Sequence, residues 1–284
     1  MSFQKILHTV VSGKDLTEYE MMAAMTQIME GNVVDSQFAA FLTALQLKHE
    51  TVPEIVGAAR VMRAKAEKVK VNASHIVDTC GTGGDGADTF NISTAVSFVV
   101  AGADITVAKH GNRAVSSKSG SADVLKYLGV NIDASLSTVE RCIEEVGIGF
   151  LFAPLMHKAM KHAAKVRKEL GFRTIFNLLG PLTNPAHAHG QVLGVYDSRW
   201  VNPLAEVLRV LGSHRALVVH GFDGLDEITL TSETQVSELK NDNVSAFTID
   251  PKEFGYSLCS AQDLKGGSPE ENAETIRGIL QGAS

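Results

Sequence analysis

The chain has 284 residues, of which 44% are hydrophobic and 20% charged, and its formal net charge is −6. This composition is typical of a globular protein, and the length allows one large core or two smaller ones. The acidic balance argues against a protein that binds duplex nucleic acid through a basic face. The isolated cysteines Cys80, Cys142 and Cys259 favour neither a disulfide framework nor a zinc site, and no apolar run is long enough to span a membrane. We therefore expect a cytoplasmic protein.

The first 70 residues have apolar positions at helical spacing. This pattern predicts three helices, over residues 18–30, 37–49 and 54–69. Thr17–Glu20 and Thr51–Glu54 are capping boxes that would begin the first and the third of these helices. A mainly helical domain over residues 1–71 follows.

From about residue 72, short apolar runs alternate with helical patterns. The expected strands are 75–79, 105–109, 148–152, 191–197 and 215–220, and the expected helices are 93–102, 121–128, 137–146, 156–170 and 200–211. Ser137–Glu140 is a third capping box. Such alternation predicts an α/β domain over residues 72–284, with a mainly parallel central sheet and flanking helices. The segment after residue 231 is polar, with one expected strand at 246–249.

Two turns rich in glycine and hydroxyl residues follow the first two expected strands, with the sequences DTCGTGGDG and KHGNRAVSSKSGS. Glycines allow the backbone N–H groups of a turn to surround an anion, and a helix that begins near Asn91 adds further free amides. Lys109 and Arg113 supply cations in the second turn. Two facing cradles of this kind predict a ligand with more than one phosphate.

Gly81, Gly83 and Gly86 also match the dinucleotide pattern G-x-G-x-x-G. That interpretation fails because no helix opens at Gly86, and because Asp104 precedes its strand instead of ending it. No G-K-[ST] sequence closes the loop, so the pattern of a P-loop is absent as well.

The two turns, together with FNIST, RTIFNLLGPLTNP and HGFDGLDE, occur in an order and spacing that resemble the anthranilate phosphoribosyltransferases of tryptophan biosynthesis. The resemblance extends over residues 1 to about 280. It implies a small helical domain, joined by a helix around 156–180, and a larger α/β domain with the architecture of nucleoside phosphorylases and phosphoribosyltransferases. It also implies a homodimer formed through the helical domain, and a Mg²⁺-dependent transfer, with two ions, of the phosphoribosyl group from phosphoribosyl diphosphate to anthranilate.

The resemblance assigns site residues in this sequence. Those implied to bind phosphoribosyl diphosphate are Gly81, Gly84, Asp85, Thr89, Asn91, Ile92, Ser93, Thr94, Lys109, His110, Gly111, Asn112, Arg113, Ala114, Val115, Ser116, Ser117 and Ser121. Those implied to lie at anthranilate are Gly81, His110, Asn112, His157, Arg167, Gly180 and Pro181. Ser93, Asp226 and Glu227 are implied to bind magnesium. An aromatic amine is already a neutral nucleophile at pH 7, so no general base is assigned.

Two departures from the family pattern bear on activity. Lys158 stands where the family usually has a proline, and the chain stops at Ser284, where relatives usually continue into further helices. Two other functions stay open at this point: a nucleoside phosphorylase of the same architecture, and a non-catalytic paralogue that binds nucleic acid through the same groove.

Overall fold

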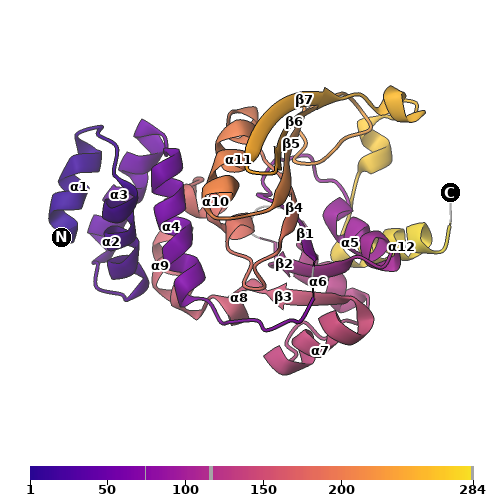
Figure 1. The fold of residues 1–284 in the computed structure, drawn as a ribbon, viewed down its shortest axis with the longest axis horizontal. Coiled ribbons are helices and arrows are strands. Elements are labelled where there is room, and N and C mark those ends of the chain that lie inside the picture. The colour runs from indigo at the N-terminus through magenta and orange to yellow at the C-terminus, as the bar shows by residue number, and fades with distance from the viewer. Residues whose placement is uncertain (74, 115–117, 283–284) are drawn as a thin grey trace. The chain divides into compact units, whose positions relative to one another are not determined.

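The structure is a computed structural model that describes residues 1–73, 75–114 and 118–282. The chain divides into two compact units (Figure 1). The first unit contains Met1–Glu67 and Met156–Thr183, and the second contains Lys68–Leu155 and Asn184–Ser284. In the part of the chain that the structure describes, no helix is long and apolar enough to cross a membrane.

The first unit is helical. Its elements are α1 (Phe3–Val11), α2 (Glu18–Met29), α3 (Asp35–Lys48), α4 (Val52–Lys65), the 3₁₀ turn η1 (Lys158–Met160), α9 (Lys161–Leu170) and α10 (Ile175–Leu182). Helix α2 packs on α4, and α1 packs on α3. Gly57 allows the close approach of α2 and α4, because a Cβ at this position would lie 2.5 Å from the carbonyl oxygen of Glu18.

Two of the three predicted capping boxes are confirmed. The boxes Thr17–Glu20 and Thr51–Glu54 cap α2 and α4. Glu54 is fully buried, and its carboxylate also accepts hydrogen bonds from the N–H of Leu16 (2.9 Å) and from Nζ of Lys48 (2.7 Å). This buried carboxylate therefore ties the loop before α2 to the start of α4.

The second unit is built on a seven-stranded sheet with the order β3-β2-β1-β4-β5-β6-β7. The strands are β1 (Ile76–Gly81), β2 (Thr106–Gly111), β3 (Ile148–Phe152), β4 (Gly190–Gly194), β5 (Arg215–Gly221), β6 (Thr234–Lys240) and β7 (Asn243–Ile249). All neighbouring pairs from β3 to β5 are parallel, and β6 and β7 extend the sheet beyond β5 as two antiparallel strands. The predicted mainly parallel sheet is confirmed.

Helices flank this sheet, as the alternating pattern predicts. They are α5 (Ile92–Gly102), α6 (Ser121–Tyr127), α7 (Leu136–Val146), the short α8 (Ala153–Met156), α11 (Val201–Val210) and α12 (Pro269–Leu280). Helix α12 packs on α5 and α6, and α11 packs on β5 and β6 (Figure 1).

Several local predictions are wrong. The capping box Ser137–Glu140 does not form, because the cap of α7 is Ser135, whose Oγ accepts from the N–H of Thr138 (3.3 Å). The helix expected over 156–170 is broken into α8, η1 and α9. The sequence analysis also missed four elements: α1, α10, β6 and α12.

Strands β1 and β2 separate part-way along their length. Their register ends at the pair Val77↔Val107, whereas β1 stays paired with β4 as far as Gly81↔Gly194. Strand β2 likewise stays paired with β3 as far as Gly111↔Phe152. The ends of β1 and β2 therefore diverge at Asp78, and side chains fill the space between them.

Candidate active site

The first glycine turn follows β1 and meets the loop after β5. Gly81 and Gly194 end neighbouring strands, and Asp226 lies directly over both of them. A Cβ on Gly81 would come within 2.5 Å of Oδ2 of Asp226, and one on Gly194 within 1.5 Å of its carbonyl oxygen. The same Oδ2 accepts the N–H of Gly83 at 2.8 Å. Because neither strand end has a side chain, the acidic loop can approach the glycine turn closely.

Asp226 and Glu227 lie in an acidic environment. Burial, followed by the neighbouring carboxylates Asp85 and Glu227, raises the pKa of Asp226 well above its usual range. Burial also raises the pKa of Glu227 to about 7, although Lys109 and the backbone N–H of Ser93 oppose this shift. Oδ2 of Asp85 accepts the N–H of Asp226 at 3.4 Å. Closely spaced, half-buried carboxylates of this kind favour a bound cation.

Lys109, on β2, brings a cation to the same edge of the sheet. Only 3% of the residue is exposed, and its Nζ donates to the carbonyl oxygen of Thr79 and to Oγ of Ser93 (3.3 Å). Burial lowers the pKa of Lys109 below its usual value, although interactions with Asp78, Cys80 and Glu227 oppose this shift. Ser93 lies in the first turn of α5, whose N-terminus carries a partial positive charge. An ammonium, amide groups and carboxylates therefore lie together at the carboxyl ends of β1 and β2.

The second glycine turn is folded around Asp123. Oδ2 of this residue accepts the N–H groups of Ala114 (2.9 Å) and Gly120 (3.1 Å). Oγ of Ser119 donates to Oδ1 of Asn91 at 3.0 Å, which ties this turn to the start of α5. The predicted ligands Val115, Ser116 and Ser117 lie outside the described residues.

Asp78 fills the space between the diverging strands. It is fully buried on β1, and its carboxylate accepts the N–H of His110 (3.3 Å) and Nδ2–H of Asn184 (2.8 Å). The second Nδ2 hydrogen of Asn184 goes to the carbonyl oxygen of Ala108 (2.8 Å). Asp78 and Asn184 thus replace the hydrogen bonds that β1 and β2 lack where they diverge. They also fix the position of the end of β2, which carries Lys109.

The other predicted residues of the α/β unit line the same two turns. Gly84, Thr89 and Ile92 belong to the first turn and the start of α5, and Gly111, Asn112, Arg113 and Ser121 to the second turn and the start of α6. Oγ of Ser121 donates to the carbonyl oxygen of Asn112 at 3.3 Å. Thr94 is fully buried behind the start of α5. The thiol of Cys80 is buried, which raises its pKa well above the usual range, so it is a packed thiol and not a nucleophile.

Four predicted residues belong to the helical unit. His157 lies just before η1, Arg167 is on α9, and Gly180 and Pro181 are on α10. The guanidinium of Arg167 stacks over the ring of Phe176, with its Cζ 5.0 Å from the ring centroid. This stacking holds the side chain in a defined direction and leaves guanidinium donors for an acceptor.

The two units match different parts of one family. Residues 4–66 match the "Glycosyl transferase family, helical bundle domain", and residues 73–284 match the "Glycosyl transferase family, a/b domain". The anthranilate phosphoribosyltransferase of Alkaliphilus metalliredigens is 58% identical over 279 residues, which are 98% of this chain and 82% of that protein. The chain belongs to the anthranilate phosphoribosyltransferase family.

Solved structures of anthranilate phosphoribosyltransferases agree with this assignment. The crystal structure of the Thermus thermophilus enzyme has a TM-score of 0.93 at 46% identity, and the comparison covers 98% of this chain and 83% of that one. The Saccharomyces cerevisiae enzyme in complex with PRPP and Mg has a TM-score of 0.88 at 29% identity, and covers 98% and 80% of the two chains.

Sequence reasoning about this anthranilate phosphoribosyltransferase family member did not single out Asp78, Asp123, Asn184 or Gly194. Asp78 carried the clearest signal, since a carboxylate in the middle of the apolar strand IVDTC must be buried and paired. Asn184 carried no local signal, because its partner Asp78 is 106 residues away. Gly194 ends a strand as many glycines do, and only the position of Asp226 explains it.

The close approach of Asp226 to β4 can be tested through Gly194. We expect Gly194→Ala to lower the free energy of unfolding by about 1–3 kcal/mol, because the added methyl group displaces the backbone of Asp226. Urea unfolding followed by the fluorescence of Trp200 measures this change. Gly102→Ala is the matched control, since its Cβ would meet no atom within 4 Å and should cost nothing. Equal stability of the two variants would contradict the packing described for Gly194.

His157 gives the helical unit a specific dependence on pH. Burial lowers its pKa from 6.5 to about 4, against a hydrogen bond with the backbone of Thr183 that raises it. The folded state therefore binds fewer protons than the unfolded state, and this residue's contribution is complete above pH 6.5. We expect up to about 3 kcal/mol of stability to be lost as the pH falls from 6.5 to 4.

The comparison with His157→Asn isolates this contribution, because all other titrating groups are shared. Urea unfolding from pH 7 to pH 4 should give the variant the smaller loss of stability on acidification. If the two proteins lost equal stability between pH 7 and pH 4, His157 would have the same pKa in the folded and unfolded states, which would contradict the prediction.

Proposed function

We propose that this chain transfers the 5-phosphoribosyl group from phosphoribosyl diphosphate to the amino group of anthranilate and releases diphosphate. Membership of the anthranilate phosphoribosyltransferase family supports this reaction, as does the Saccharomyces cerevisiae relative in complex with PRPP and Mg. The observation that carries the proposal is the position of Asp226 over Gly81 and Gly194, with the neighbouring Glu227 beside Lys109 and the backbone N–H of Ser93. Carboxylates, one ammonium and the positive end of α5 would then bind a single polyphosphate.

In this proposal the two turns hold the doubly phosphorylated sugar. The amides of the glycine turn and of the α5 N-terminus are suited to phosphate oxygens, and Lys109 adds a fixed positive charge. Asp123 keeps the second turn closed around its own amides, so that Asn112, Arg113 and Ser121 face a defined space. The side chain of Arg113 is 51% exposed, with Oδ1 of Asp123 3.7 Å away, and can turn toward an anion.

The acidic residues fit magnesium. The pKa of Asp226 is raised by burial and by two neighbouring carboxylates, a repulsion that a divalent cation would relieve. Among the described residues, no group of three or more His, Cys, Asp and Glu side chains is placed to hold a metal. Asp226, Glu227 and Ser93 would therefore hold the ions together with substrate oxygens, as Mg²⁺ sites commonly do. When bound, magnesium neutralises charge on the departing diphosphate. We propose two ions, since adjacent carboxylates can serve two.

Positive charge develops on the sugar ring as diphosphate leaves, so the protein contributes mainly by stabilising the leaving group and placing the amine. Lys109 and the amides around Ser93 stabilise the negative charge on the diphosphate. No side chain needs to remove a proton before attack, because the amino group of anthranilate is uncharged at neutral pH. A proton leaves the nitrogen only after the new C–N bond has formed.

We assign recognition of anthranilate to His110 and Asn112 in the α/β unit, with Gly81, and to His157, Arg167, Gly180 and Pro181 in the helical unit. A guanidinium can form two parallel hydrogen bonds with the anthranilate carboxylate. The stacking of Arg167 on Phe176 supports this role, because it pre-orients the group.

Replacing Arg167 by Ala should raise the KM for anthranilate by about 10- to 100-fold, the effect of losing one charge-assisted pair, and leave the KM for phosphoribosyl diphosphate within about twofold. Steady-state kinetics with each substrate varied in turn measures the two constants. Lys168→Ala is the control, since Lys168 neighbours Arg167 on α9 and is exposed. Equal increases in both constants would remove the assignment.

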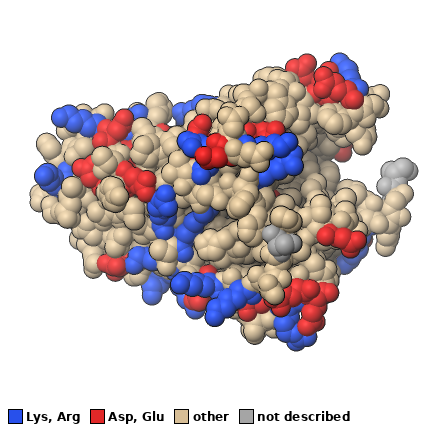
Figure 2. All heavy atoms as spheres, viewed as in Figure 1, with Lys and Arg blue, Asp and Glu red and all other residues tan. Residues whose placement is uncertain are grey.

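The comparisons support this reaction and not the two alternatives. Relatives named anthranilate phosphoribosyltransferase match nearly the whole chain, which favours it over a nucleoside phosphorylase. The groove of a nucleic-acid-binding paralogue would need a basic surface. On the face drawn in Figure 2, side chains of both charges are interspersed among uncharged residues.

The proposal also includes a homodimer formed through the helical domain, a cytoplasmic location, and a division into a helical domain, 1–71 joined by a helix around 156–180, and an α/β domain within 72–284. The compact units, of which the helical one contains Met156–Thr183, and the two family matches support this division. Sedimentation equilibrium tests the dimer. The reaction itself is tested by mixing the protein with phosphoribosyl diphosphate, Mg²⁺ and anthranilate and following anthranilate fluorescence, which should fall. A constant signal with folded protein would refute the proposed activity.

A further inference from the structure

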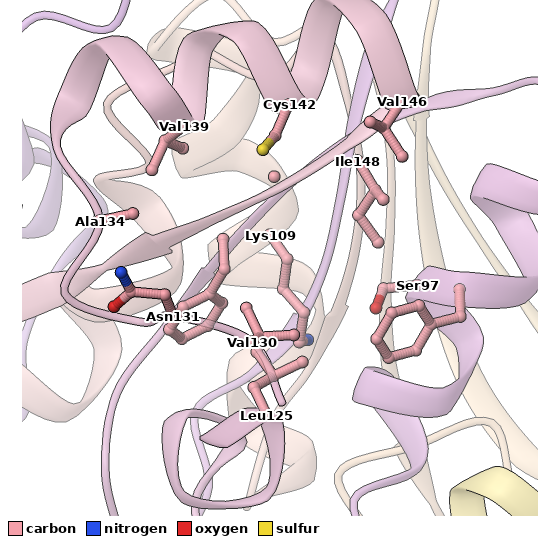
Figure 3. A pocket seen from close by; sticks show the side chains of 13 residues that line it. Ser97, Lys109, Leu125, Val130, Asn131, Ala134, Val139, Cys142, Val146 and Ile148 are labelled. Carbon is pink, nitrogen blue, oxygen red and sulfur yellow. The ribbon is translucent and has the colours of Figure 1, made fainter. Parts of the chain in front are cut away.

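A cavity of about 200 Å³ lies in the α/β unit (Figure 3). Its walls come from α5, β2, α6, α7 and β3, and from the loop between α6 and α7. Cys142 and Val139 point into it from α7, opposite Leu125 and Val130 (Figure 3). Of the residues proposed to hold substrate, its wall contains Lys109, whose Nζ donates to Thr79 and Ser93.

Several polar atoms of the wall form hydrogen bonds with other parts of the chain. Oγ of Ser97 donates to the carbonyl oxygen of Thr94 (2.6 Å), and Nζ of Lys109 donates to Thr79 and Ser93. Oδ1 of Asn131 accepts the N–H of Asp133 (3.1 Å). What remains toward the cavity is mainly carbon, together with the thiol of Cys142, a weak hydrogen-bonding group.

The cavity can be reached from outside. Asn131 and Val146, which both line it, are exposed, and 68% of the surface of Val146 is accessible. The thiol-bearing Cys142 is half-buried between them on the α7 side. A molecule can therefore enter beside the C-terminal half of α7 without passing through the glycine turns.

We propose that this cavity is a binding site for one small uncharged apolar molecule, of about the size of benzene or toluene. An apolar cavity of about 150 Å³ in another protein stays dry and binds benzene, because water there finds too few polar partners. The present cavity is larger and has the same kind of lining. A charged ligand would lose its hydration without gaining a partner, and is excluded.

Toluene is the probe, and the intact chain provides its own control in Cys259, which is half-buried and does not line the cavity. At toluene concentrations of ten times the dissociation constant, about one molecule in eleven is free of ligand, so labelling of Cys142 by a thiol reagent should slow about tenfold. Labelling of Cys259 should not change, and the melting temperature should rise. Benzylammonium, which has a similar size and a positive charge, should have neither effect.

Ala134→Leu fills the cavity and should abolish the effect of toluene on Cys142, whereas the neighbouring Asp133→Asn, which does not line it, should preserve that effect. The proposal would be overturned if toluene left the labelling rate of Cys142 unchanged, or if it slowed the labelling of Cys142 and Cys259 equally. Protection that persists in Ala134→Leu would do the same. The assay contains neither the sugar nor the amine, so its result is independent of the proposed reaction.

Discussion

Replacing Asp226 by Asn together with Glu227 by Gln is expected to lower the turnover number at saturating substrates by at least about 100-fold. Both carboxylates are assigned to magnesium, and neither replacement can carry the negative charge that a hard cation requires. The folded protein should nevertheless be at least as stable as the original chain. Burial and neighbouring carboxylates raise the pKa of Asp226, so its ionised form is disfavoured in the folded state, and a neutral residue removes that cost.

Initial rates over a range of Mg²⁺ concentrations, together with urea unfolding, measure both effects. Asp242→Asn is the control, because Asp242 is exposed in the turn between β6 and β7, and asparagine tolerates its positive φ of 60°. An acid pair variant with an unchanged rate and an unchanged magnesium requirement would show that the ions are held elsewhere.

Asp78→Asn should destabilise the α/β unit by about 3–5 kcal/mol, although the side chain keeps its size. The carboxylate accepts two N–H groups, from His110 and from Asn184, whereas an amide oxygen would satisfy only one of them and the new NH₂ would face the other. Lys109, which is buried near Asp78, would also lose its main opposite charge. Urea unfolding monitored through Trp200, the only tryptophan in the sequence, reports on this unit.

A double-mutant cycle with Lys109→Met separates the charge effect from the hydrogen-bond effect. Each single variant leaves one buried charge unpaired, and the double variant leaves none, so the double variant should be more stable than the sum of the two changes predicts, by at least about 1 kcal/mol. Asp88→Asn, at an exposed acid, should change stability by less than about 0.5 kcal/mol. Simple additivity would mean that Asp78 and Lys109 do not stabilise each other.

The regular part of the fold follows from local pattern. The first five strands and the helices between them have apolar runs, capping residues and glycine stops that lie close in sequence, and these signals gave the mainly parallel sheet. The failures have physical causes. Strand β6 has the sequence TQVSELK, which looks like a polar loop, yet Val236 and Leu239 are fully buried between β5, β7 and α11. At α7, Ser135 and Ser137 could both cap, and only the geometry of the preceding loop decides between them.

The site divides in the same way. The glycine turns and the Asp226–Glu227 pair could be recognised from composition and order, because each group is contiguous. The contacts that orient them could not. Asp226 meets Gly83 across 143 residues, and Asn184 meets Asp78 across 106. Such contacts depend on which strands become neighbours, and no local pattern records that β1 lies beside β4.

The central claim is that two amide-rich turns and an acid pair at one edge of the sheet hold one doubly phosphorylated sugar. The most direct test is a crystal structure of the chain grown with phosphoribosyl diphosphate and Mg²⁺. The account predicts density for the diphosphate against the amides of the glycine turn and Ser93, with metal density at Asp226 and Glu227. Density for the sugar at any other place, with both turns free of ligand, would contradict it.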